Sequence, residues 1–129
     1  MNIPKTLRYT KEHEWAKPAG QTAIVGITEF AVEQLGDITL VELPAVGRTV
    51  KAGEAIGVIE SVKAVSDLFS PLSGTVQKVN QQLENAPEKV NEDPYGEGWM
   101  IELKIKSPAE VEALLNAEAY QAHLNSLEE

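Results

Sequence analysis

Short apolar stretches separated by glycine, proline and charged residues make up most of the hydrophobic pattern of this chain. Each stretch predicts one short strand, and together they cover residues 25–27, 38–43, 48–51, 55–59, 75–79 and 100–105. In the last stretch Ile101, Leu103 and Ile105 share one face, as a half-buried strand requires. Many short strands joined by glycine and proline turns predict a mainly β fold, with antiparallel strands in a sandwich or barrel.

Helical signals occur at three places between and after these stretches. Thr28 is a suitable N-cap and Gly36 a suitable stop for a short helix over residues 29–35. Residues 107–110 read Ser-Pro-Ala-Glu, which predicts a capping box at the start of a helix whose Val111, Leu114 and Leu115 share a face.

A second helix start at Asn116 predicts a helix from Ala117 to Leu127, with Tyr120 and Leu124 one turn apart on the same side. We expect this C-terminal helical segment to pack over a sheet and enlarge the core. Residues 80–98 are polar, and we expect a long connection there.

The composition limits the functions that this chain can have. Its 129 residues suit a single domain, 1–129, and its formal net charge of −9 disfavours binding to nucleic acid. No apolar run approaches the length of a membrane span, so we expect no membrane partner. The absence of cysteine excludes a disulfide scaffold and thiolate-bound metals.

We find no pattern typical of an enzyme. The two histidines, His13 and His123, are far apart in sequence, and neither a phosphate-binding loop nor a metal-spaced cluster is present. We therefore predict no catalytic residue and no metal site. The chain begins at Met1 and reaches its first motif almost at once, so we expect a cytoplasmic bacterial protein, with a mature mitochondrial form as the alternative.

Lys63 is the residue with the most distinctive surroundings. The apolar run 55–59 leads into it and residues 68–76 lead away, which predicts a hairpin with the lysine near its tip. Most lysines at turns are simply solvated charges. A lysine at a hairpin tip also holds its amine out from the body of the protein, which suits covalent attachment of a prosthetic group.

The sequence around Lys63 resembles the attachment hairpin of lipoyl domains. The resemblance rests on Glu60, Ser61, Lys63, Ala64, Ser66 and Asp67, followed by the Ser-Pro-x-x-Gly-x-Val pattern at 70–76. Biotin-carrier domains use a related hairpin in which methionine flanks the lysine on both sides. Here Val62 and Ala64 flank it, which favours lipoate.

The rest of the chain is similar to the H-protein family of the glycine cleavage system. Five ordered segments carry this similarity: LRYTKEHEW at 7–15, VGITE at 25–29 with LGD at 35–37, VELP at 41–44 with VG at 46–47, the lysine hairpin, and VN at 90–91 with PYGEGW at 94–99. The resemblance implies a flattened antiparallel barrel or sandwich of the lipoyl-domain type, with two halves related by a pseudo-twofold axis. A weak repeat of glycine and apolar residues on the two sides of Lys63 agrees with such halves.

The resemblance also implies a function. Lipoate would be joined by an amide to Lys63, and its arm would carry the aminomethyl group of glycine from glycine decarboxylase (P protein) to aminomethyltransferase (T protein). Dihydrolipoyl dehydrogenase (L protein) would reoxidise the arm, and a lipoate-attaching enzyme would load it. Two alternatives remain open: a carrier that relays lipoate to other lipoyl enzymes, and a biotin carrier.

The same resemblance suggests which side chains serve the arm. A carrier that folds the loaded arm onto its own surface would exclude water from the cargo. The candidates for holding the cationic amine of the arm there are Glu12, Glu14, Ser66 and Asp67. The candidates for recognition of the attachment hairpin by the loading enzyme are its nearest residues, namely Glu60, Ser61, Val62 and Ala64.

Three aromatic residues beside these candidates receive structural roles. The family often has histidine or tyrosine at position 30, so we assign Phe30 no role beyond packing. We expect His13 to make a structural hydrogen bond and Trp15 to be a core or edge aromatic.

Overall fold

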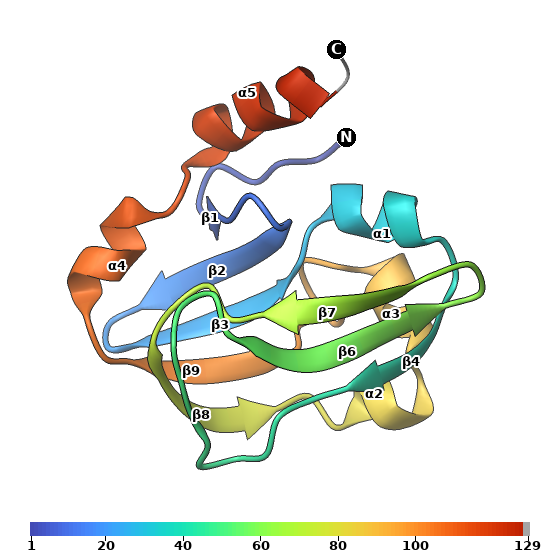
Figure 1. Ribbon diagram of the computed structural model, residues 1–129, viewed down its shortest axis with the longest axis horizontal. Helices are drawn as coiled ribbons and strands as arrows, with labels where there is room; N and C mark the ends of the chain where they lie inside the picture. The colour runs from blue at the N-terminus through green and yellow to red at the C-terminus, as the bar shows by residue number, and fades with distance from the viewer. Residues whose placement is uncertain (128–129) are drawn as a thin grey trace.

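Two antiparallel sheets form the body of the protein. A computed structural model describes residues 1–127 (Figure 1). The larger sheet has six strands in the order β1 (Arg8–Tyr9), β2 (Glu14–Ala19), β3 (Thr22–Ile27), β9 (Ile101–Ile105), β8 (Gly74–Val79) and β5 (Thr49–Val50). The smaller has the order β4 (Ile38–Glu42), β6 (Ala55–Ser61) and β7 (Val65–Phe69). The predicted mainly β fold, a flattened sandwich of antiparallel strands, is confirmed.

The main core lies between the two sheets. Ile59 and Leu68 of the smaller sheet and Val25, Val76 and Leu103 of the larger sheet are all at most 1% exposed and belong to one apolar cluster. Alternation along each strand sends these side chains inward and leaves the outer face of β4–β6–β7 to solvent. That solvent-facing sheet includes the β6–β7 hairpin (Figure 1). Lys63 lies in the turn between these two strands.

The first helix forms where local signals predict it. In α1 (Glu29–Leu35) the Thr28 hydroxyl accepts a hydrogen bond of 3.3 Å from the backbone N–H of Ala31. Gly36 ends the helix with a φ of 77°, a left-handed conformation that costs glycine little.

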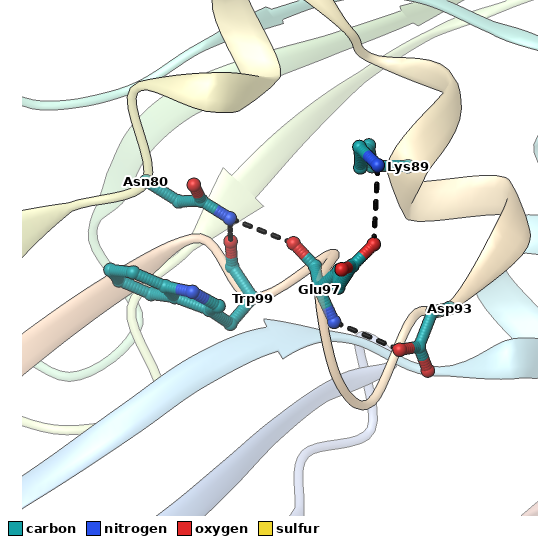
Figure 2. A network of polar contacts seen from close by, with 5 residues as sticks. All are labelled: Asn80, Lys89, Asp93, Glu97 and Trp99. Carbon is teal, nitrogen blue, oxygen red and sulfur yellow. Dashed lines mark hydrogen bonds and ion pairs between the residues drawn. The ribbon is translucent and has the colours of Figure 1, made fainter.

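The connection over residues 80–98 is more regular than expected. It contains α2 (Gln82–Asn85) and α3 (Glu88–Glu92), because Leu83 and Val90 are fully buried and anchor one helix each. Polar contacts hold the returning loop beneath α3 (Figure 2). The Asn80 side-chain amide donates to the carbonyl oxygens of Glu97 and Trp99 at 2.8 Å each, and the Lys89 amine lies 3.2 Å from the Glu97 carboxylate.

The C-terminal helices are α4 (Pro108–Ala113) and α5 (Ala117–Leu127). The predicted capping box at residues 107–110 is wrong: Ser107 makes no side-chain cap bond, and the Glu110 carboxylate instead accepts bonds from the backbone N–H and hydroxyl of Ser73, each 2.9 Å long. Leu115 also leaves the predicted helix face, because it forms a β-bridge with Tyr9.

A second apolar cluster joins the two ends of the chain. Helix α5 begins at Ala117, as predicted, and the side chain of the preceding Asn116 accepts a bond of 2.8 Å from Ala119 N–H. Tyr120 and Leu124 are buried against Leu7, Tyr9 and Trp15. The N-terminal strands β1 and β2, which the hydrophobic pattern did not indicate, supply the other side of this cluster. Over residues 1–127, no helix has the length and apolar character needed to span a membrane.

Candidate functional site

Lys63 lies at the exposed tip of the β6–β7 hairpin. The ladder ends with Glu60 opposite Val65, and beyond it the Ser61 N–H donates to the Ala64 carbonyl at 2.8 Å. The Ser61 hydroxyl accepts a further bond of 3.1 Å from the Ala64 N–H, which closes the turn around the lysine. Val62 is 71% exposed, so the tip projects into solvent. The sequence-based placement of Lys63 in this turn agrees with the structure.

The lysine stem rests on the end of α1. A β-carbon built on Gly36 would lie 3.3 Å from Lys63 Cε, so the aliphatic part of Lys63 runs along the Gly36 backbone. The Val62 N–H donates to the Asp37 carbonyl at 3.1 Å, which ties the hairpin tip to the segment after α1.

A cavity of about 310 Å³ opens near the other end of β7. Its lining residues are Thr10, Glu12, Glu14, Gly53, Phe69, Ser70 and Pro71. Phe69 is the last residue of β7, and Lys63 precedes the first by two positions. At the rise of a strand, the chain from Lys63 to Phe69 spans at most about 20 Å. Strand β7 therefore runs from the lysine tip to the cavity.

Glu14 is the buried carboxylate of this cavity, at 2% exposure. One carboxylate oxygen accepts a bond of 2.6 Å from the Thr10 hydroxyl, and within residues 1–127 the other has a single long contact of 3.5 Å from the Phe69 N–H. Burial raises the pKa of Glu14 to about 7, because these hydrogen bonds only partly offset the loss of hydration. A carboxylate in this state favours a cationic partner.

The four residues considered as holders of the arm do not all reach the cavity. Glu12 and Glu14 line it together, Glu12 as an exposed carboxylate at its rim. On β7, Asp67 alternates onto the same face as Phe69 and is exposed, while Ser66 points to the opposite face with buried Leu68. The described lining includes neither Ser66 nor Asp67.

Beside the cavity, His13 has the structural role expected of it. Its Nδ1 lies 2.9 Å from the Tyr120 hydroxyl, which is also 2.7 Å from the Thr28 hydroxyl. Burial, and then the nearby His123, lower the pKa of His13. Phe30 packs against His13 with ring centroids 4.5 Å apart, which is the packing role expected for it.

Trp15 is a core aromatic at 1% exposure. Its indole N–H donates to the Pro94 carbonyl at 3.1 Å.

Comparison with known proteins identifies the family. The sequence pattern of the family described as Glycine cleavage H-protein matches residues 7–127. The chain belongs to the glycine cleavage H-protein family. A glycine cleavage system H protein of Anaeromyxobacter sp. (strain K) is 56% identical over 99% of this chain and 100% of its own length. A corresponding protein of Thermus thermophilus is 53% identical over 98% of each chain.

A solved structure agrees with this assignment. The crystal structure of a glycine cleavage system H protein from Mycobacterium marinum matches with a TM-score of 0.88 and 41% identity, over 95% of this chain and 99% of that one. Membership of the H-protein family therefore extends to the fold as well as to the sequence.

Sequence reasoning did not find every residue of the cavity. Thr10 lies within the N-terminal motif, but its bond to Glu14 was not anticipated. Phe69, Ser70 and Pro71 follow the hairpin in sequence, and only the return of β7 to the N-terminal turn brings them to Glu14. Within residues 1–127 no group of three or more acidic or histidine side chains is placed to hold a metal ion.

Proposed function

We propose that this chain is the lipoyl carrier of glycine cleavage, with lipoate joined by an amide bond to Nζ of Lys63. The observation that carries the proposal is the exposed position of Lys63 at the tip of the β6–β7 hairpin in a chain of the H-protein family. The turn bonds of Ser61 and the exposed neighbours Val62 and Ala64 leave the amine accessible to a loading enzyme.

The chain itself performs no chemistry in this proposal. When bound, lipoate would supply a disulfide that opens so that one sulfur takes up the aminomethyl group of glycine and the other becomes a thiol, and the dithiol left after transfer would be reoxidised to the disulfide by dihydrolipoyl dehydrogenase. The partners are glycine decarboxylase, aminomethyltransferase and dihydrolipoyl dehydrogenase, and each would receive the lipoyl arm attached to the same hairpin. Tethering raises the local concentration of the cargo at each enzyme, and docking must be short-lived because three enzymes share one carrier. We place the protein in the bacterial cytoplasm.

The Glu14 cavity fits the cationic end of a loaded arm. Glu14 offers a buried carboxylate oxygen with one long hydrogen bond, and Phe69 and Pro71 provide apolar walls. An amine beside Glu14 would be shielded from water, which slows hydrolytic loss of the cargo. Glu12 at the rim and Asp67 on the outer face of β7 would add weaker attraction, because exposed charges are screened.

Mass spectrometry of protein produced in lipoate-replete cells tests the attachment. We expect the mass increase of one lipoyl group on the native chain, its complete loss in Lys63→Arg, and its retention in the control Lys51→Arg, which removes another exposed lysine. Lipoylation of Lys63→Arg would refute the assignment, and a biotinyl mass increase would replace lipoate with biotin. Turnover of glycine with the three partner enzymes then separates glycine cleavage from lipoate relay.

A further inference from the structure

Asn91, on α3, uses both groups of its side-chain amide on one short segment. Its Nδ2 donates to the Gly36 carbonyl at 2.8 Å, and its Oδ1 accepts from the Ile38 N–H at 2.9 Å. These two residues flank Asp37. The side chain therefore binds the segment 36–38 at both of its ends. An amide can do this because it carries a hydrogen-bond donor and an acceptor on the same planar group.

The segment 36–38 is the one that supports the attachment hairpin. The Asp37 carbonyl accepts the bond from Val62 N–H, and Gly36 lies under the stem of Lys63. Ile38 begins the pairing of β4 with β6 opposite Ser61. Each of the three residues in the segment thus touches the hairpin within two positions of Lys63.

Helix α3 is tied to the loop that follows it. The Asp93 carboxylate accepts a bond of 3.0 Å from the Glu97 N–H, and the Lys89–Glu97 pair closes the same loop (Figure 2). A β-carbon on Gly98 would lie 2.8 Å from the Val90 Cα, so the loop packs directly against the helix beside Asn91. A continuous set of contacts therefore runs from this loop through Asn91 to the hairpin tip.

We propose that Asn91 is a positioning residue that sets where Lys63 is presented to the enzyme that loads it. The proposal rests on the proposed function, because it takes Lys63 as the attachment site. In this proposal Asn91 acts on the lysine only indirectly, because its side-chain bonds go to Gly36 and Ile38 and hold the 36–38 segment against which the tip is ordered. Without these bonds, the tip samples more positions, and the amine reaches the reacting geometry less often once the carrier has docked.

The test uses Asn91→Asp, which keeps the size of the side chain and the acceptor but removes the donor to Gly36. The matched control is Asn85→Asp, an equal change at an exposed position of α2. Lipoate loading of the full-length protein by a bacterial lipoate ligase gives kcat and KM, and ¹⁵N relaxation of the unmodified protein gives the order of amides 62–64. For Asn91→Asp we expect a kcat about tenfold lower, a KM within about twofold of native, and lowered order parameters at the tip. The control should match the native protein.

Native kcat and native tip order in Asn91→Asp would overturn the proposal, as would a defect confined to KM, since that would indicate damage to the docking surface. Asn91→Ser, which shortens the side chain, replaces Asn91→Asp if the introduced charge prevents folding, and the same outcomes apply. Loading of Lys63→Arg separates failure of the proposed function from failure of the positioning role. If Lys63→Arg is still loaded, the attachment site is wrong. If Lys63→Arg is not loaded and both Asn91 variants are loaded at the native rate, only the positioning role is rejected.

Discussion

The Thr10 hydroxyl donates a hydrogen bond of 2.6 Å to Glu14, yet Glu14 keeps a pKa of about 7. The bond stabilises the charged form, and burial destabilises it by more. The ionised form of Glu14 is therefore destabilised by burial despite the bond from Thr10, and a cation placed beside the carboxylate would stabilise it.

The first prediction is that Glu14→Gln stabilises the protein at alkaline pH. The folded pKa is raised from 4.5 to about 7, so the folded state binds more protons than the unfolded state between these values, and Glu14 makes stability fall as pH rises through that window. Removing the group should raise the free energy of unfolding by about 3 kcal/mol at pH 8 and by less than about 1 kcal/mol at pH 5. Urea unfolding of both proteins at the two pH values measures this, and a pH-independent difference would contradict it.

The second prediction is that Glu14 protects the cargo. In Glu14→Gln the cavity keeps its shape and loses its charge, so formaldehyde should be released from the loaded carrier several-fold faster after removal of glycine decarboxylase. High salt should have a smaller effect on the native protein, since a buried charge is only weakly screened. Asp67→Asn is the comparison: because Asp67 is exposed, its loss should change the rate by less than about twofold. Equal rates in native and Glu14→Gln protein would leave Glu14 without this role.

The third prediction concerns the position of the lysine in its turn. Exchanging Val62 and Lys63, as Val62→Lys with Lys63→Val, moves the amine by one residue and away from the Gly36 backbone. Because adjacent side chains next to a strand point to opposite sides, we expect loading at least about tenfold slower. Mass spectrometry of a timed ligase reaction reports the rate. Loading as fast as in the native chain would contradict the prediction, because it would show that the enzyme does not require the lysine at the native position of the turn.

The fourth prediction tests the contact between α5 and the body of the protein. The Tyr120 hydroxyl lies between Thr28, which is fully buried, and His13. Tyr120→Phe leaves both partners without it and should lower the free energy of unfolding by about 1–3 kcal/mol. Lipoate loading at Lys63 should be unchanged, because the apolar cluster around Tyr120 includes no residue of the β6–β7 hairpin among the described residues. Thermal unfolding with a parallel loading assay checks both statements, and a loss of loading in folded protein would contradict the second.

Local signals in the sequence were sufficient for the elements that position Lys63. Thr28 and Gly36 delimit α1 because capping and a positive φ are properties of one or two residues. The hairpin was predictable for the same reason, because its two strands and the short turn between them are contiguous in the sequence.

Contacts between distant segments were not predictable in this way. Glu110 occupies the capping-box position, but Ser73 offers it two bonds across the fold, and those bonds prevail over the local cap. The helices α2 and α3 were missed because a single buried residue anchors each, too few for a helical period to be visible. The meeting of Glu14 with Phe69 depends on the packing of β7 beside the N-terminal turn, and neither segment alone indicates it.

Because burial raises the pKa of Glu14, a cationic amine bound there as proposed would compete with a proton for the same carboxylate. Because burial raises the pKa of Glu14 to about 7, Glu14 can hold a proton in the empty carrier near neutral pH, and an amine that entered the cavity would have to displace it. If the cargo binds there as proposed, its binding would be coupled to the release of part of a proton to the buffer, and mild acidification would weaken that binding. The carrier would respond to the acidity of its surroundings through one carboxyl group, with no change in the attachment chemistry at Lys63.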